Sequence, residues 1–468
     1  MKAILISVDT LRADHVGAYG WQFNTTPRID EWADRGVLFD RCYATDVPTP
    51  PSYTSIFSGR YGVHNGIFGF QNPSTYRAGS PMVQTLFEAE GHDTCAISNL
   101  FYPCPWLLPG WRTVMPPGLR FQRGTALEVT NTAIEWLEAN GKHDFFLFVH
   151  YWEPHQPYNK APDEHRKLFP TEEYGEAAPE ADIMFNNPIM KDFHRYYHQG
   201  GEGEPDITPA EVMARYDSQI HYADAEVGRL FSWLDQNSLE EETTVILTSD
   251  HGEAFGEYGS FDHLTCYENI SHVPLIIRAP GRFPEGKRVS GLVCGTDIYA
   301  TILELAGIDI PDSADSRSLV ECSVSETAAP HDSIVTDTNA LCAQRMIVRN
   351  TWGLVHTINR GPFDHVKPWE LFELNGDPEN EVSKENPDIV SDLKDRMEAW
   401  LLRMTGGDID PLVIAAQQGG WTFGNGCFVK SVMEHLDIAA GDPQIWESIR
   451  HCKGASSLDL ISKFMGTE

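Results

Sequence analysis

Positive charge is scarce in this chain of 468 residues. Lys and Arg number 35 against 68 Asp and Glu, which gives a formal net charge of -33 at pH 7. Nucleic acids and anionic membranes are bound by protein faces rich in Lys and Arg. We therefore expect neither nucleic acid nor a membrane as a partner. A small anionic substrate remains compatible with the composition, because a metal ion and a few cationic groups can hold it inside a cleft.

Long apolar runs and paired cysteines are also lacking. No stretch of 18 or more apolar residues occurs, so no transmembrane helix is predicted. The first residues, M-K-A-I-L-I-S-V-D, are too short in apolar length for a secretory signal. The nine cysteines are scattered and form no C-x-x-C pair. We therefore expect a cytoplasmic protein with reduced thiols.

Apolar segments of strand length alternate with amphipathic segments of helix length. The strands are predicted at 3–8, 144–150, 243–250 and 272–278, and the helices at 27–36, 82–91, 126–141 and 210–234. Continuous apolar runs are typical of parallel strands that are buried on both faces. The alternation predicts a doubly wound α/β fold, with a mostly parallel sheet flanked by helices.

The composition and the hydrophobic pattern change along the chain, and these changes predict its domains. We assign the α/β catalytic domain to residues 1–325, with a polar, acidic insertion at 158–209. Short alternating segments and a helix at 386–404 predict a small α+β domain with an antiparallel sheet over 326–404. Residues 405–468 form a C-terminal extension, for which covering the cleft and forming a homo-oligomer contact are both open.

Two of the predicted strands end in an acid. Asp9 follows the first strand, and Asp250 follows another and is itself followed by His251. The carboxyl ends of parallel strands meet at one edge of a sheet. Two carboxylates and an imidazole there could bind a divalent cation. The alternative is that each Asp only caps a loop or a helix.

Several motifs, in this order, resemble the sulfatase branch of the alkaline phosphatase superfamily. They include S-V-D-T-L-R-A-D-H, D-V-P-T-P-P-S-Y-T-S-I-F-S-G-R, T-S-D-H-G-E, Y-E-N-I-S-H-V-P-L-I-I-R-A-P-G, D-I-Y-A-T-I-L-E-L-A-G-I and L-F-E-L-N-G-D-P-E-N-E. The matches extend from residue 1 to about residue 404. The resemblance implies a metal-dependent hydrolase of anionic esters with an alkaline phosphatase-like fold.

The chain departs from the family at the position of the nucleophile. The family signature is C/S-x-P-S-R, and here T-P-P-S-Y places Thr49 at its first position and Tyr53 at its last. Family sulfatases oxidise Cys or Ser there to formylglycine, and Thr cannot give that aldehyde. We therefore expect no formylglycine, an unmodified Thr49 as the nucleophile, and Tyr53 among the substrate-binding residues. The alternative is that Thr49 only caps the helix that follows it.

The resemblance also implies the metal ligands. These are Asp9, Thr49, Asp250 and His251, while Thr10 stands where the family commonly has a second Asp. A divalent cation is expected, and Zn, Mn, Mg and Ca all remain open. We interpret Arg12 and Asp14 as a structural ion pair, and His150 and His272 as packing residues at strand ends.

Two lysines that bind the anion in the family are absent. Asn99 and His263 stand in their places, and His155 corresponds to a histidine that contacts substrate. Asn99 is expected to bind the oxyanion, and His155 or His263 to protonate the leaving group or activate water. A competing hypothesis is a second metal held by Glu153, His155 and His263.

A Thr nucleophile favours phosphorus over sulfur. We therefore expect a small anionic ester as substrate, either a phosphate monoester or diester or a phosphonate ester. Hydrolysis of sulfate esters and transfer of a phosphoryl-type group to an alcohol remain alternatives. A catalytically inactive binding protein is the third alternative.

Overall fold

The computed structural model describes residues 1–70, 76–101, 103–118, 123–175, 207–325, 329–361, 363, 365–378 and 380–417. The predicted insertion at 158–209 is therefore described without residues 176–206, and the predicted extension only as far as residue 417. Within these ranges, every helix is too short or too polar to cross a bilayer.

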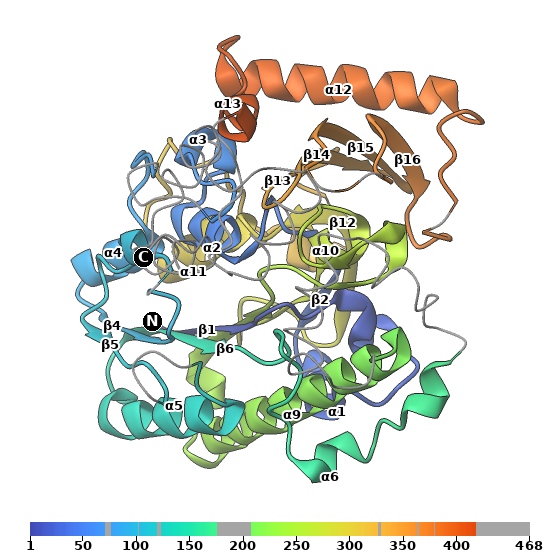
Figure 1. The fold of residues 1–468 in the computed structure, drawn as a ribbon. Helices are drawn as coiled ribbons and strands as arrows, with labels where there is room; N and C mark the ends of the chain where they lie inside the picture. Colours follow the sequence, from blue (N-terminus) through green and yellow to red (C-terminus); the bar gives the residue numbers. More distant parts are fainter. Residues whose placement is uncertain are drawn as a thin grey trace, which may run out of the picture.

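A nine-stranded sheet forms the centre of the catalytic domain (Figure 1). The order is β10-β2-β11-β7-β1-β6-β4-β5, and β12 also pairs with β2. Strand β1 lies between β6 and β7 and is parallel to both, which confirms the predicted mostly parallel sheet. The strands are β1 Lys2–Val8, β2 Val37–Tyr43, β4 Asp93–Ile97, β5 Thr113–Val114, β6 Phe145–Tyr151, β7 Thr243–Thr248, β10 His272–Val273, β11 Leu275–Arg278 and β12 Lys287–Cys294.

The predicted strand at 272–278 differs from the expectation in two ways. It is divided into β10 and β11 at Pro274, and β11 runs antiparallel to both β7 and β2. Proline has no N–H to donate to a neighbouring strand, which explains the interruption. An apolar run shows that a strand is buried but does not show its direction.

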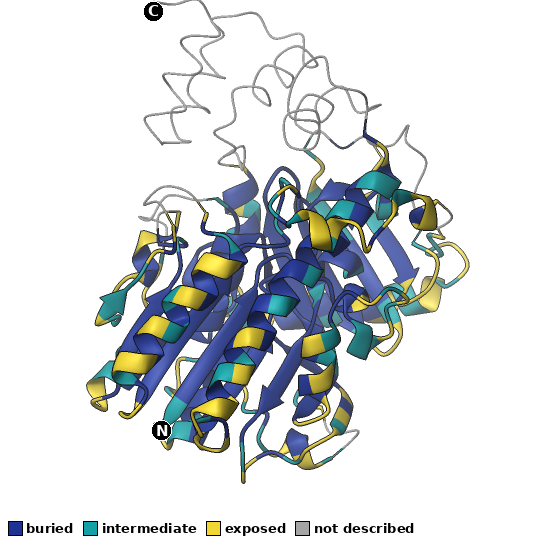
Figure 2. Cartoon of the chain, turned by 90° about the horizontal axis from the view of Figure 1, so that it is seen from below, coloured by how far each residue is buried: buried dark blue, intermediate teal, exposed yellow. Residues whose placement is uncertain are grey.

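Helices cover both faces of the central sheet (Figure 1). Alternate side chains of β1 enter two different cores, with Ile4 and Ile6 on one side and Ala3 and Leu5 on the other. The first core is covered by α1, α5 and α9, whose outer faces are exposed (Figure 2). The second is covered by α2, α4 and α11. These helices are α1 Pro27–Ala33, α2 Thr49–Ser58, α4 Val83–Ala89, α5 Ala126–Asn140, α9 Pro209–Gln236 and α11 Asp297–Ala306.

A five-stranded sheet in the order β16-β15-β14-β13-β3 forms the small domain. Strands β13 to β16 are antiparallel, as the sequence predicts, and helix α12 packs against them. The edge strand β3 comes from the catalytic domain and pairs in parallel with β13. Since β3 ends two residues before Thr49, the small domain fixes the entry to α2. The elements are β3 Asp46–Val47, β13 Ile334–Asn339, β14 Ala343–Arg349, β15 Trp352–Asn359, β16 Trp369–Glu373, α12 Pro387–Thr405 and α13 Pro411–Gln417.

Short elements complete the described chain. Strands β8 and β9 form a two-stranded sheet directly after the D-H-G-E segment. The remaining elements are β8 Ala254–Phe255, β9 Phe261–Asp262, α3 Gly62–Asn65, α6 Asp163–Arg166 and α10 Glu268–Ser271.

Candidate active site

The two strand-end acids come together at the carboxyl ends of β1 and β7. Because these strands are parallel neighbours, Asp9 and Asp250 leave the sheet side by side. One ligand atom each from Asp9, Asp250 and His251 lies within 4.8 Å of the other two, and all three side chains are buried. The structure therefore assembles the three side chains that the sequence predicts as metal ligands.

Each carboxylate keeps one oxygen that accepts no hydrogen bond from the described residues. Asp9 accepts from His150 through Oδ2, at 3.0 Å, and Asp250 accepts from the Thr10 N–H through Oδ1, at 3.0 Å. The buried Asp9 Oδ1 and Asp250 Oδ2 are left without such a partner. Burial and the neighbouring Asp250 raise the pKa of Asp9 well above its usual value. A divalent cation would compensate both carboxylates, so the site fits the metal that the sequence implies.

His251 has the tautomer that a metal requires. Its Nδ1 lies 2.9 Å from the carbonyl oxygen of Gly252 and donates to it, which leaves Nε2 without a proton. Burial lowers the pKa of His251, so the ring is neutral. Nε2 lies 3.1 Å from Thr49 Oγ1 and 3.3 Å from Asp250 Oδ2. Carboxylate, imidazole and hydroxyl ligands together suit a hard or borderline divalent cation.

Thr49 is the first residue of α2 and does not cap it. The residue at the cap position is Pro48, and no side chain caps the helix. The Thr49 hydroxyl instead faces His251, although the side chain is only 4% exposed. Ser52, one turn further along α2, donates through Oγ to the carbonyl oxygen of Asp250 at 2.7 Å. The helix is thus fastened to the metal-binding segment, with Thr49 held beside the ligands.

Tyr53 supports the site from within the fold. It is fully buried, its hydroxyl lies 2.8 Å from Ser7 Oγ, and its ring packs edge-on against His150 at 5.2 Å between centroids. These contacts give no support to the predicted contact between Tyr53 and substrate. A tyrosine cannot replace the charge of the family's arginine. Here Tyr53 packs behind the metal ligands, against His150 and Ser7.

His150 was interpreted from sequence as a packing residue, but it contacts Asp9. Burial lowers its pKa to about 3, so the ring is neutral. Because a carboxylate only accepts, Nε2–H donates to Asp9 Oδ2, and Nδ1 accepts from the Ser98 hydroxyl at 2.8 Å. Ser98 Oγ accepts in turn from the Leu100 N–H at 2.9 Å. This chain of hydrogen bonds orients Asp9 toward the metal position. The parallel register of β6 and β1, which pairs Ser7 with His150, could have indicated the contact.

His263 forms a hydrogen-bonded pair with an acid. Its Nδ1 lies 3.0 Å from Glu253 Oε1, and Glu253 Oε2 accepts from the Tyr158 hydroxyl at 2.9 Å. Burial opposes protonation of His263, but Glu253, together with Asp262 and Asp9, raises the pKa of the imidazole above its usual value. The ring lies beside that of His251, at 4.6 Å between centroids. Glu253 was not among the residues predicted from sequence.

The predicted second metal group does not assemble. The rings of His155 and His263 do lie together, at 5.0 Å between centroids. Glu153 lies 3.9 Å from the Lys160 ammonium, however, and its pKa is raised by burial. Across the described part of the chain, Glu153, His155 and His263 are not found as a group of three ligand atoms within 4.8 Å. Glu153 and His155 are close in sequence. The carboxylate of Glu153, however, does not join the two imidazoles in one group of ligand atoms.

Asn99 stands at the carboxyl end of β4 with an amide that is available for a ligand. Both its Oδ1 and its Nδ2 are buried and have no hydrogen-bond partner among the described residues. A buried amide without partners is costly unless a bound group satisfies it. This is the environment expected of the oxyanion-binding residue that the sequence predicts.

Arg123 brings a positive charge to the site that sequence reasoning missed. Its Nη1 lies 2.6 Å from His155 Nδ1 and 2.9 Å from the carbonyl oxygen of Gln156. The guanidinium also lies over the ring of Trp152, at 4.3 Å from its centroid. Burial, and then Arg123 and His263, lower the pKa of His155 well below its usual value. His155 is therefore neutral, with the Arg123 charge beside it.

Comparison with known proteins agrees with this geometry. The family described as Sulfatase matches residues 2–103 and 108–308, which is more than half of the chain. This chain belongs to the sulfatase family. A second family, described as N-sulphoglucosamine sulphohydrolase, C-terminal, matches residues 256–405.

The relatives of this sulfatase act on different esters. It is 23% identical over 457 residues to the N-acetylglucosamine-6-O-sulfatase of Bacteroides thetaiotaomicron, with 80% of this chain and 81% of that protein covered. A solved structure in complex with its substrate D-glucosamine-2-N,6-O-disulfate has a TM-score of 0.69 at 20% identity, covering 87% of this chain and 99% of that one. The phosphonate monoester hydrolase of Silicibacter pomeroyi has a TM-score of 0.67 at 22% identity, covering 87% and 96%. Membership of the sulfatase family makes this chain an ester-hydrolysing enzyme, of a family whose members use a divalent metal.

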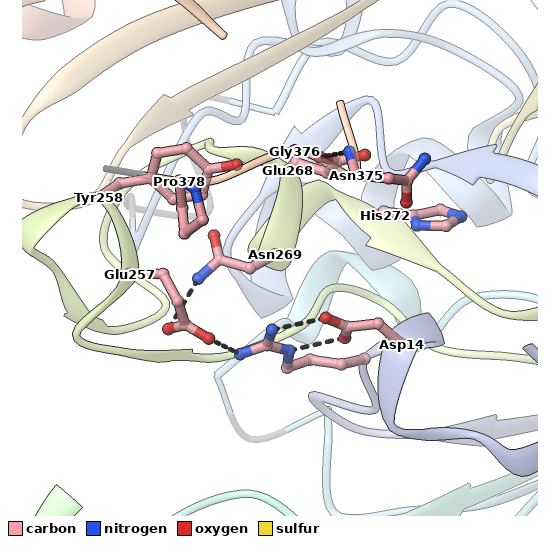
Figure 3. A pocket seen from close by; sticks show the side chains of 10 residues that line it. Asp14, Glu257, Tyr258, Glu268, Asn269, His272, Asn375, Gly376 and Pro378 are labelled. Atoms are coloured by element: carbon pink, nitrogen blue, oxygen red, sulfur yellow. Dashed lines mark hydrogen bonds and ion pairs between the residues drawn. The ribbon is translucent and has the colours of Figure 1, made fainter. Parts of the chain in front are cut away.

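A cavity of about 280 Å³ is lined by residues of the catalytic domain and of the small domain (Figure 3). Asp14 and Glu257 in its wall both pair with the Arg12 guanidinium, at 2.7 and 2.6 Å, which confirms the predicted Arg12–Asp14 ion pair. Another part of the wall is the small-domain loop that carries Asn375 and Pro378. None of the metal-ligand candidates lines this cavity, so in this sulfatase it is a feature of the domain boundary.

Proposed function

We propose that this enzyme hydrolyses phosphate or phosphonate esters, with the unmodified hydroxyl of Thr49 as the nucleophile. The observation that carries the proposal is the position of Thr49 Oγ1, 3.1 Å from His251 Nε2 and beside the carboxylates of Asp9 and Asp250. The Thr49 hydroxyl does not cap α2. Its position beside the predicted metal ligands supports Thr49 as the nucleophile.

The chemistry of threonine distinguishes this site from a formylglycine site. A hydrated formylglycine can release sulfate when it collapses back to the aldehyde. A Thr ester cannot collapse, so water must attack the sulfur or phosphorus atom directly in the second step. Such hydrolysis is familiar for phosphoenzymes, and this favours phosphorus as the reacting centre.

The proposed reaction consists of two displacements at phosphorus. Thr49 Oγ gives up its proton to solvent and forms a bond to phosphorus, while the bond to the leaving oxygen breaks and that oxygen takes a proton from His263. Water then attacks the same phosphorus and gives a proton to His263, while Thr49 Oγ is released and takes a proton from solvent. A divalent cation held by Asp9, Asp250 and His251 would lower the pKa of the Thr49 hydroxyl and compensate charge on the transferred group. Asn99 donates its free Nδ2–H to an oxygen of that group.

His263 is the proposed proton donor to the leaving oxygen. The hydrogen bond from Nδ1–H to Glu253 fixes the ring and leaves Nε2 available to the substrate. Among the described residues His155 contacts no acid, and its Nδ1 lies 2.6 Å from Arg123 Nη1 and 2.8 Å from the carbonyl oxygen of Gln156. We therefore assign the acid role to His263 and a positioning role to His155.

The comparisons allow both ester classes. The likeness to a phosphonate monoester hydrolase extends over almost the whole of that chain, and it concerns the fold. The curated relatives include sulfatases, so sulfate esters are the competing substrate class. The identity of residue 49 is what favours phosphorus over sulfur in this chain.

A panel of esters of one aryl alcohol tests the proposed substrate class. The metal-loaded enzyme is expected to hydrolyse the phosphate or phosphonate ester with a kcat/KM at least about tenfold above that for the sulfate ester, equal to about 1.4 kcal/mol of transition-state stabilisation. Steady-state release of the alcohol measures all members on the same scale. A preference for the sulfate ester would contradict the proposal. Product analysis with an added alcohol acceptor distinguishes hydrolysis from transfer.

Arg123 is expected to attract and hold the anionic substrate. The chain carries a large negative charge, and the family's two anion-binding lysines are replaced, so an exposed guanidinium at His155 has a strong effect on a nearby anion. We expect Arg123→Gln to raise KM about tenfold, because a hydrogen bond to a charged group contributes about 1.5–3 kcal/mol. Arg112→Gln is the matched control, since Arg112 pairs with Asp93 away from the site. An unchanged KM in Arg123→Gln would show that this charge does not meet the substrate.

A further inference from the structure

Three potential metal ligands converge at a second place, away from the active site. They are Cys294 at the end of β12, Asp297 at the start of α11, and His331 in the segment that leads into β13. One ligand atom from each lies within 4.8 Å of the other two. Cys294 and Asp297 are buried, and the His331 side chain is only 9% exposed. Two adjacent elements deliver the thiol and the carboxylate, and a segment 34 residues beyond Asp297 delivers the imidazole to the same point.

The distances within this cluster approach those of a zinc site. Cys294 Sγ lies 3.8 Å from His331 Nε2. Zinc bonds of about 2.3 Å to sulfur and about 2.05 Å to nitrogen at a tetrahedral angle require a separation of about 3.6 Å. His331 Nε2 also lies 2.8 Å from Asp297 Oδ2. Replacing the shared proton by zinc would require these two atoms to separate to about 3.3 Å, a movement of about half an ångström.

The surroundings hold the ligands in place. The Asp297 carboxylate accepts backbone N–H groups of Cys294 and Arg317, at 3.0 and 2.9 Å, so its orientation is fixed. The Tyr61 hydroxyl lies 3.9 Å from Cys294 Sγ. Structural zinc sites are usually closed by four protein ligands, whereas a site with three protein ligands keeps a water molecule at the fourth position.

We propose that Cys294, Asp297 and His331 bind a zinc ion that ties the catalytic sheet to the small domain. Strand β12 and helix α11 belong to the catalytic domain, whereas His331 precedes the first long strand of the small sheet. A sulfur, nitrogen and oxygen donor set suits zinc better than magnesium or calcium, which prefer oxygen alone. The site is independent of the ester chemistry and does not rest on the function proposed above.

Cobalt(II) distinguishes this site from the active site, because only this one contains sulfur. Metal-free full-length protein, prepared with a chelator, is titrated with Co²⁺ and followed by absorption spectroscopy. We expect a thiolate-to-cobalt charge-transfer band in the near ultraviolet that, in Asp250→Asn, saturates at one equivalent per chain. The band is expected to be lost in Cys294→Ser and retained in Asp250→Asn. Cys95→Ser is the matched control, since Cys95 is also a buried free cysteine but lies on β4, outside the cluster.

Absence of the band in the wild-type protein, or its persistence in Cys294→Ser, would overturn the proposal. A second variant, His331→Gln, keeps the thiol and tests the site if Cys294→Ser does not fold. Added Zn²⁺ is expected to raise the melting temperature of Asp250→Asn, and to leave that of the double variant Asp250→Asn, His331→Gln unchanged. Equal shifts in the two proteins would contradict zinc binding at this cluster.

Discussion

Thr49→Ala is expected to lower kcat by at least about 10³-fold on every ester that the enzyme hydrolyses, because removal of a nucleophile eliminates the covalent step. The variant should keep its fold and its metal. Thr49 is at the first position of α2 and takes no part in capping it, while Ser52 still fastens the helix to Asp250. Steady-state rates, metal content and melting temperature measured on the same preparation separate the loss of the nucleophile from the loss of the site.

Two further variants test whether the loss of the Thr49 hydroxyl itself causes the lower kcat. Thr49→Ser keeps the hydroxyl and is expected to retain most of the activity. Ser58→Ala removes a buried hydroxyl from the last turn of the same helix, where it donates to the carbonyl oxygen of Thr54, and is expected to have little effect. Full activity in Thr49→Ala would mean that the hydroxyl beside His251 is not the nucleophile.

Asp250→Asn is expected to reduce the affinity for the metal by at least about 100-fold and to abolish activity at ordinary metal concentrations. Substitution of a residue that only orients a metal ligand already lowers the metal affinity about 10–100-fold, and loss of a charged ligand is expected to lower it more. The asparagine can still accept the Thr10 N–H through Oδ1, so the local structure should be kept. Metal content per chain and the metal concentration that restores half of the rate measure the effect.

The same variant has an effect on stability that activity alone would not reveal. Burial and Asp250 raise the pKa of Asp9, which shows that the two carboxylates repel each other without a cation. Metal-free Asp250→Asn should therefore melt no lower than metal-free wild type, whereas added metal should stabilise only the wild-type site. Asp14→Asn is the control, because Asp14 pairs with Arg12 and lies outside the metal group. A large loss of stability in metal-free Asp250→Asn would contradict this account of the site.

Strand ends were the most informative part of the sequence. Asp9 and Asp250 could be predicted as neighbours because each follows an apolar run, and parallel strands deliver their last residues to one edge. The direction of β11 could not be predicted, since burial on both faces makes parallel and antiparallel strands alike in composition. The small antiparallel sheet was predicted, but not its fifth strand β3, which has only two residues and lies 287 or more residues before its partner in the chain.

Side-chain direction limited the prediction of the site. His150 and Glu253 act through hydrogen bonds to Asp9 and His263, and those partners are set by the register of the sheet and the path of a loop. Arg123 lies in the segment before α5, where no periodic pattern marks it, and only the folded chain brings it to His155. The second metal group was inferred from the loss of two lysines and the gain of metal-ligand residue types at the same cleft, and the carboxylate of Glu153 lies 3.9 Å from Lys160 instead.

The most direct test of the central claim is to identify the residue that carries the transferred group. The metal-loaded enzyme is mixed with a good phosphate or phosphonate ester, quenched with acid during turnover, digested, and examined by mass spectrometry. The account predicts that the peptide containing Thr49 gains the mass of the transferred group at Thr49, and that the unreacted peptide has the mass of unmodified threonine. An enzyme that turns over rapidly with the group on another residue, or with a chemically modified residue 49, would contradict it.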